Sequence, residues 1–432
     1  MKNKKLIKRV IIICILVIVI ELLVMLFIKI KRDREMTFFD GLNDIALNGD
    51  GYVGVGESDF DDSKYVKQKK YQYDDKNIIA TRSKIAIYDN QKNLIKENTF
   101  DSEYDSTFYS VLKVDDGFIA VGSIISDSKQ IELNVRDALI VKYDSDLNIK
   151  WSKTYSVLSD TEFYKIIDDG NDNYVVIGQS IYENMELGNH ITGGGIIVRY
   201  NKDGEIVAHN NYGGNKSGIF NDIIKVNDGY IVCGRDATNY GIVVKFKNDF
   251  NREESDNGLI SKKVAWQRTY SNTDTEGFTG MTLVNDTLYV CGALNISDEK
   301  DKDGNTLFKY DAGIVLYNTS GKYLGKKINL NDDIHNLFTS ITSDNKYLYL
   351  TTLLDVDKSD TQKNSMLIKY DLDGNVIKKE LFNDKNIVLN KIIRFDDNYL
   401  VVGTSNTKCT LLKGCNYEPI INTYDSELKT IN

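Results

Sequence analysis

The chain has 432 residues, 41% of them hydrophobic, and one proline against 27 tyrosines and 31 glycines, which favours sheets joined by Gly/Asn/Asp turns over proline-rich linkers. Five cysteines in this length are too few for a disulfide-stapled scaffold. The net charge is −9, and because residues 1–35 hold nine Lys/Arg and three Asp/Glu, the rest carries −15, which repels phosphate backbones and excludes nucleic acid as an expected partner.

An apolar run of 19 residues extends from Val10 to Ile28 and is interrupted only by Glu21. At about 1.5 Å per residue, a helix of this length nearly spans a hydrocarbon core of about 30 Å. A signal peptide has a shorter apolar region followed by a small-residue cleavage site, whereas Lys29 and three further residues ending in Arg32 follow here. The run predicts an uncleaved transmembrane helix, in which Glu21 either contacts another helix or is a tolerated acid.

The charges beside this run set its expected orientation. Five Lys/Arg precede it and four follow it, which favours a cytoplasmic N-terminus and an extracytoplasmic main body. We therefore expect a single-pass protein of the cell membrane. Its expected parts are a cytoplasmic tail (1–9), a transmembrane anchor helix (10–28), a juxtamembrane linker (29–41) and an extracytoplasmic domain (42–432).

One segment recurs along the expected extracytoplasmic domain. Each copy contains two short β-rich runs joined by an Asp-Gly or Asn-Asp type of turn, a pattern that predicts a hairpin. The third copy has one inserted residue, and the sixth is degenerate. The copies begin at Leu42, Phe108, Phe163, Phe220, Phe278, Leu337 and Leu389.

A second hairpin follows in every copy and carries an aromatic residue at a fixed place. Seven units of two hairpins each, repeating about every 56 residues, predict an all-β fold, a seven-bladed β-propeller of four-stranded antiparallel blades preceded by one transmembrane helix. The neighbours of a blade cover both of its faces, which explains why many strands are apolar at nearly every position. The aromatic markers are Tyr88, Tyr143, Tyr200, Phe246, Tyr317, Tyr370 and Tyr424.

The repeated pattern Phe-x-x-Ile…Asp-Gly-Tyr-Ile-Val-x-Gly, then Ile-Val-Lys-Tyr-Asp-x-x-Gly-x-Ile-x-Trp, resembles the repeats of bacterial secreted or surface seven-bladed β-propeller proteins. Residues 108–155 match this pattern best, and the resemblance covers residues 42–432. It implies the fold and an extracytoplasmic setting. It implies no catalytic residues, because the shared positions are turn and core positions.

The variable connections predict the working face of the propeller. Links between units and connections between the two hairpins of a unit vary in length and emerge on one side, where binding residues tend to lie. The longest connection, Ser58–Ser83, contributes the candidate ligand-binding residues Tyr65, Tyr71 and Tyr73. The links between units are acidic, so they either attract a cation or a basic partner or form a solvated rim. Their candidate ligand-binding acids are Asp101, Glu103, Asp105, Asp160, Glu162, Asp274 and Glu276.

A candidate metal site lies in the fifth unit, where oxygen donors alternate as in the start of a calcium loop. The twelfth position is Tyr310 instead of the usual Glu, so a charged turn is the alternative interpretation. Calcium is the one cofactor that the sequence suggests. The candidate ligands are Glu299, Asp301, Asp303 and Asn305.

The cysteines of the repeats carry no recognisable chemistry motif. Cys233 and Cys291 occupy equivalent strand positions in adjacent units, where other copies have Val or Ile, so we expect small core side chains. Cys409 and Cys415 flank a short insertion and are either bridged or free.

These features favour a membrane-anchored module that binds or scaffolds a protein or glycan partner at the cell envelope, without catalysis. One alternative is a glycan-active or quinone-dependent propeller enzyme whose acids converge at the mouth of the channel. Another is an assembly factor for a membrane complex, which would give Glu21 and the anchor a partner.

Overall fold

The structure is a computed structural model in which every regular element of the described residues is a β-strand. The candidate anchor, residues 10–28, lies outside these residues, and no helix within them is long and apolar enough to cross a membrane. The described residues are 40–59, 72–73, 76–77, 81–102, 104–126, 135–157, 160–184, 190–212, 218–236, 240–251, 263–270, 277–300, 306–330, 335–355, 363–382, 387–410 and 414–431.

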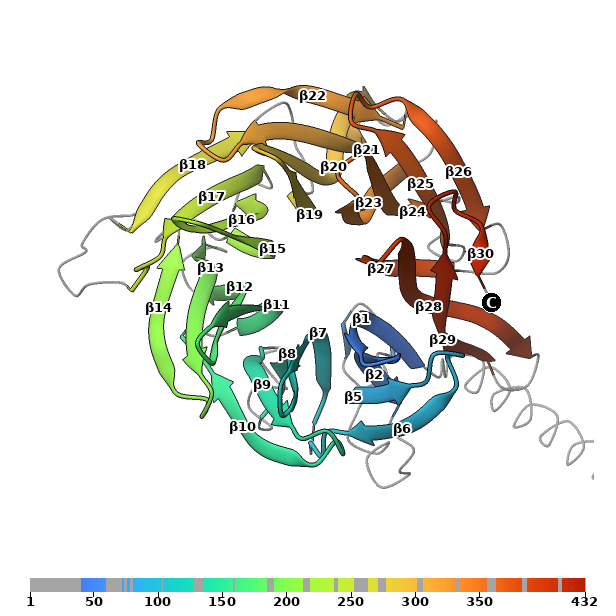
Figure 1. Ribbon diagram of the computed structural model, residues 1–432. Helices are drawn as coiled ribbons and strands as arrows, with labels where there is room; N and C mark the ends of the chain where they lie inside the picture. The colour runs from blue at the N-terminus through green and yellow to red at the C-terminus, as the bar shows by residue number, and fades with distance from the viewer. Residues whose placement is uncertain are drawn as a thin grey trace, which may run out of the picture.

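Seven antiparallel sheets of four strands stand around a central axis, which confirms the expected seven-bladed β-propeller (Figure 1). Blade 1 contains β1 (Asp40–Asn48), β2 (Gly51–Asp59), β5 (Thr81–Tyr88) and β6 (Leu94–Thr99). Blade 2 contains β7 (Ser106–Val114), β8 (Gly117–Ile124), β9 (Asp137–Tyr143) and β10 (Ile149–Tyr155). Blade 3 contains β11 (Asp160–Gly170), β12 (Asn173–Asn184), β13 (His190–Asn201) and β14 (Ile206–Tyr212). Blade 4 contains β15 (Gly218–Val226), β16 (Gly229–Asp236), β17 (Gly241–Lys247) and β18 (Val264–Tyr270).

The remaining blades follow the same order. Blade 5 contains β19 (Gly277–Val284), β20 (Thr287–Lys300), β21 (Thr306–Asn318) and β22 (Tyr323–Asn329). Blade 6 contains β23 (His335–Ser343), β24 (Tyr347–Asp355), β25 (Lys363–Asp371) and β26 (Val376–Phe382). Blade 7 contains β27 (Ile387–Phe395), β28 (Asn398–Thr410), β29 (Gly414–Tyr424) and β30 (Thr430–Ile431). A separate two-stranded pair, β3 (Gln72–Tyr73) and β4 (Lys76–Asn77), lies in the long connection of blade 1.

The core consists of the layers between blades. Between blades 1 and 2, for example, Val53 and Ile85 pack with Phe108 and Val141, and all four are fully buried. Burying each such side chain stabilises the fold by roughly 1.5–3 kcal/mol. Cys233 and Cys291 are buried in these layers and are free, as expected for small core side chains.

The innermost strand of every blade carries a β-bulge at the same place, and this bulge defines three positions. The first is a fully buried anchor residue: Leu42, Phe108, Phe163, Phe220, Phe278, Phe338 or Leu389. The second is the bulge residue: Asn43, Tyr109, Tyr164, Asn221, Thr279, Thr339 or Asn390. The third, here called the axial residue, is Asp44, Ser110, Lys165, Asp222, Gly280, Ser340 or Lys391.

The sixth repeat begins one residue later than the sequence pattern predicted. Phe338, not Leu337, is the fully buried residue before the bulge, because the register shift falls between Phe338 and Ser340. Leu337 is partly exposed. Two adjacent large apolar residues satisfy the sequence pattern equally, and only the strand register separates them.

The ring closes without exchange of strands between the first and last blades. Blade 7 supplies its own outer strand, β30, which pairs with β29. Across the closing seam, the Asn390 side-chain amide donates to the Leu42 carbonyl at 2.8 Å.

Candidate ligand-binding site

In five blades the bulge residue ties its blade to the next one. Its amide or hydroxyl donates a hydrogen bond to the backbone carbonyl of the next blade's anchor residue, and we call this bond the inter-blade staple. It satisfies a backbone acceptor at the edge of the innermost strand. The donors and acceptors are Asn43 and Phe108, Asn221 and Phe278, Thr279 and Phe338, Thr339 and Leu389, and Asn390 and Leu42.

Blades 2 and 3 depart from this rule, because their bulge residues are Tyr109 and Tyr164. The Tyr109 hydroxyl donates to one oxygen of the Glu162 carboxylate at 3.0 Å, and that of Tyr164 donates to the other at 3.1 Å. The two rings lie 5.2 Å apart. The Gln179 amide donates to the same carboxylate at 2.9 Å. Glu162 is thus held at the start of β11 by three donors from two blades.

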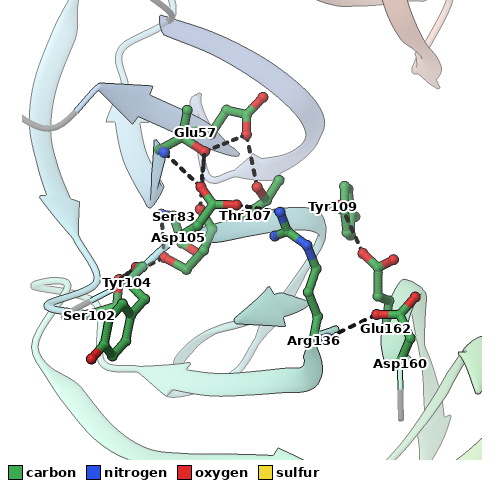
Figure 2. A network of polar contacts seen from close by, with 12 residues as sticks. Glu57, Ser83, Ser102, Tyr104, Asp105, Thr107, Tyr109, Arg136, Asp160 and Glu162 are labelled. Carbon is green, nitrogen blue, oxygen red and sulfur yellow. Dashed lines mark hydrogen bonds and ion pairs between the residues drawn. The ribbon is translucent and has the colours of Figure 1, made fainter. Parts of the chain in front are cut away.

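A pair of carboxylates, Glu57 and Asp105, lies on the side of blade 1 (Figure 2). Glu57, near the end of β2, accepts hydrogen bonds from the Thr107 hydroxyl at 2.8 Å and the Thr81 hydroxyl at 2.9 Å. The Thr81 hydroxyl also lies 3.2 Å from Asp105, which accepts the Thr81 backbone N–H at 2.7 Å. Thr81 therefore links the two carboxylates.

Arg136 lies between the two groups of acids. Its guanidinium forms an ion pair with Asp105, and its backbone N–H donates to Asp160 at 2.9 Å (Figure 2). The buried Nη1 of Arg136 has no hydrogen-bond partner among the described residues. Although burial alone would lower the pKa of Arg136, the negative charges around it, Asp105 first and then Glu162, raise it above its usual value.

Protonation within the network is shifted by burial. Burial raises the pKa of Glu57, the neighbouring charge of Asp105 raises it further, and the hydrogen bonds from Thr107 and Thr81 only partly oppose this. Burial and the charge of Glu162 raise the pKa values of Tyr109 and Tyr164, so both remain hydrogen-bond donors at neutral pH.

These side chains form one site, which we call the mouth site. It comprises Glu57, Asp105, Tyr109, Arg136, Asp160, Glu162, Tyr164 and Gln179. They come from blades 1 to 3, on the face where the innermost strands begin. Four carboxylates and one guanidinium give a formal charge of −3, and the mixture of acceptors, amide, phenols and guanidinium suits recognition of a polar ligand.

Three of the candidate acids, Asp105, Asp160 and Glu162, meet in the mouth site, where Arg136 of the same chain is paired with Asp105 and lies among all three. Asp101 is exposed on the preceding link. Tyr73 lies in β3 and Glu299 in β20, but their side chains are not among those described. Among the described residues, no group of three or more His, Cys, Asp or Glu side chains is arranged to hold a metal ion. Candidates outside the described residues are Glu103, Asp274, Glu276, Tyr65, Tyr71, Asp301, Asp303 and Asn305.

Sequence reasoning missed Glu57, Arg136, Gln179 and the two tyrosines. The tyrosines left a signal in the repeats, since five copies have Asn or Thr after the anchor residue and only two have Tyr. Arg136 has no equivalent in the repeated pattern, and its place in the mouth site results only from the way the fold brings blades 1 to 3 together.

No protein-family model and no curated protein sequence matches this chain. Among solved structures, it is similar to the polysaccharide lyase Uly1, with a TM-score of 0.50 and 8% identity over 88% of this chain and 90% of that one. The lignostilbene dioxygenase of Pseudomonas brassicacearum has a TM-score of 0.48 and 9% identity over 90% of this chain and 88% of that one. At these identities the likeness to the lyase shows the propeller fold alone.

Proposed function

We propose that this protein is a membrane-anchored, extracytoplasmic propeller that binds a polyhydroxylated ligand, a glycan, at the mouth site. The observation that supports this most directly is the loss of the inter-blade staple in blades 2 and 3. There the repeat's structural donor is replaced by two tyrosines that orient Glu162. Giving up a repeated stabilising contact at one place in the ring is typical of a functional position.

The chemistry of the mouth site suits sugar hydroxyls. Carboxylate oxygens accept hydrogen bonds from hydroxyl groups, and tyrosine faces pack on the apolar faces of sugars. The site's formal charge of −3 and the acidic body disfavour polyanions. We therefore expect a neutral or amino-substituted glycan.

Calorimetry with the full chain in detergent tests this proposal. The probes are a neutral N-acetylglucosamine hexamer, a cationic glucosamine hexamer and an anionic galacturonate hexamer. We expect binding of the neutral or the cationic probe, about tenfold weaker in Glu162→Gln, where one of the two acceptor oxygens becomes an amide donor. Tyr323→Phe, an exposed tyrosine of blade 5, is the matched control and should bind like the wild type. Absence of binding to all three probes, or equal binding by Glu162→Gln, would contradict the proposal.

The raised pKa of Glu57 favours a second candidate function, a glycan-active enzyme. Raising the pKa of Glu57 favours its protonated form, and the neighbouring Asp105 is ion-paired with Arg136, so the two acids are arranged as a candidate proton donor beside an anion. The fold is shared with a polysaccharide lyase. Mass spectrometry of oligosaccharides incubated with the full chain checks this candidate: new, shorter products that disappear in Glu57→Gln would support it, and intact probes would rule it out for those glycans.

A further inference from the structure

A cavity of about 460 Å³ lies between blades 2 and 3, on the opposite face of the propeller from the mouth site. The mouth site forms where the neighbouring innermost strands β7 and β11 begin, whereas the cavity lies where both strands end (Figure 1). Asp115 and Asp116 line it from the turn of blade 2, and Asp168 and Asp172 line it from the turn of blade 3. Its volume is within the range of pockets that bind small molecules.

The turn of blade 3 differs from the equivalent turns of the other six blades. Only this inner hairpin has a second register shift, between Asp168 and Gly170, where the third copy of the repeat has its inserted residue. Gly170, Asn171 and Asp172 follow with positive φ angles of 77°, 53° and 57°. This irregular turn carries two of the lining carboxylates, so the cavity borders a departure from the repeat.

A buried tyrosine reaches the cavity as well. Tyr174 lines it from the second position of β12 and is only 4% exposed. Its hydroxyl forms no hydrogen bond with any other described residue. A buried hydroxyl usually has a partner, because removing it from water without one costs free energy. The cavity therefore contains a polar atom that a ligand can satisfy.

The equivalent tyrosines of two other blades do have a partner. The hydroxyls of Tyr230 and Tyr399, at the second positions of β16 and β28, each donate to a carboxylate in the turn of the preceding blade. In the blade that precedes Tyr174, Lys142 lies 2.9 Å from Asp116 and so engages one carboxylate of the turn. The Tyr174 hydroxyl is thus left without the acceptor that its equivalents have.

The cavity has more unpaired negative charge than positive charge. Of its three lysines, Lys142 is paired with Asp116, and Lys113 donates to the Val114 carbonyl at 2.6 Å. The third, Lys202, is exposed. Three lining carboxylates form no ion pair with the described residues: Asp115, Asp168 and Asp172.

These charges act directly on Tyr174. Burial first, and then the charges of the four lining carboxylates, raise the pKa of Tyr174 to about 12, so the hydroxyl is neutral at physiological pH. The same charges attract a cation. The described carboxylates are not arranged to hold a metal ion, so the cavity suits a larger cation.

We propose that this cavity binds a small organic amine with two or more ammonium groups, such as a diamine or a triamine. An ammonium group has three N–H donors and no acceptor, which matches a site of unpaired carboxylates and one phenol oxygen. A short chain between two ammonium groups lets one end bind the acids of blade 3 beside Tyr174 and the other bind Asp115 of blade 2. This site is separate from the mouth site and does not depend on glycan binding there.

Calorimetry with the full chain in detergent tests the proposal, with the triamine spermidine as the probe and the dicarboxylate glutarate as the probe of opposite charge. We expect spermidine to bind and glutarate not to bind. Tyr174→Phe should weaken spermidine binding about tenfold, because it removes a hydrogen bond to a charged group. Phe118 occupies the equivalent position of β8, so the fold accepts phenylalanine there. Tyr52→Phe, at the equivalent position of β2, is the matched control and should bind like the wild type.

A second variant tests the carboxylates. Asp172→Asn removes one charge, and asparagine tolerates the positive φ of this position, so the variant should weaken spermidine binding about threefold. Absence of spermidine binding, binding of glutarate in its place, or equal affinity of the wild type and Tyr174→Phe would overturn the proposal. Loss of spermidine binding in Glu162→Gln but not in Tyr174→Phe would place the amine at the mouth site and would overturn it as well.

Discussion

Two of the aromatic markers that reveal the repeat carry hydroxyl groups that the fold does not use. The hydroxyls of Tyr143 and Tyr200 are buried and have no hydrogen-bond partner among the described residues. The equivalent marker of blade 4 is Phe246, which is equally buried without a hydroxyl. The ring, not the hydroxyl, therefore carries the packing at this position.

We expect Tyr143→Phe to raise the free energy of unfolding by up to about 1 kcal/mol, because it removes a buried, unsatisfied polar group. Tyr349→Phe is the matched control, since the Tyr349 hydroxyl lies 3.1 Å from the Asp344 carboxylate and 3.2 Å from the Ser426 carbonyl. That variant should lose about 1–3 kcal/mol in urea denaturation. A loss of the same size from Tyr143→Phe would show that its hydroxyl has a partner.

Glu57 should make stability depend on pH. Its folded pKa is raised above the unfolded value, so its contribution to stability is greatest below the unfolded pKa and is lost as pH rises through the folded one. Glu57→Gln removes this loss and keeps an oxygen that can accept from Thr81 and Thr107. We expect its melting temperature to exceed that of the wild type at neutral pH, with a difference that shrinks towards about pH 4. A constant difference across this range would contradict the raised pKa.

At the scale of the strands, the bulge residue is the unit that joins neighbouring blades. Asn221→Ala leaves the Phe278 carbonyl without its donor and should cost about 1–2 kcal/mol of unfolding free energy. Asn221→Thr should cost less, because Thr279 and Thr339 perform the same role in other blades. Chemical denaturation of the two variants separates the contribution of the hydrogen bond from that of side-chain packing. Equal losses of unfolding free energy in both variants would mean that the staple contributes little.

The hairpins could be predicted from the sequence, whereas the inter-blade staples made by the bulge residues could not. Turn residues and apolar runs are local signals, so the repeats that begin at Phe108 and Phe220 marked their strands directly. The staples join residues 50 to 348 positions apart, and no local pattern encodes such a pairing. The same reason explains why the acidic links predicted Asp105 and Glu162, while Arg136 emerged only from the fold.

At the scale of the whole molecule, the closing seam depends on the C-terminal segment. Tyr424 and Leu428 are buried with Tyr349 and Tyr399 of blades 6 and 7, and Lys369 lies 2.8 Å from Glu427. Removal of residues 424–432 should therefore lower the unfolding free energy by several kcal/mol, given about 2–5 kcal/mol for each large core side chain lost.

The control for this truncation is removal of Asn432 alone, which should leave the denaturation curve in place. If the chain that ends at residue 423 were as stable as the full chain, the ring would close without this segment. Native-state hydrogen exchange on the truncated chain should show the loss of protection first in blades 7 and 1, on either side of the seam.

The first strand also fixes where the chain enters the propeller. Asp40 pairs with Ser58, and Gly41 pairs with Glu57, so the polypeptide enters directly beside the mouth site. Under the proposed anchor, residues 29–39 form a tether that spans at most about 40 Å when fully extended. The mouth site would then stay within about that distance of the bilayer, and a ligand attached to the same membrane would meet it at a high effective concentration, so that even weak contacts give substantial occupancy.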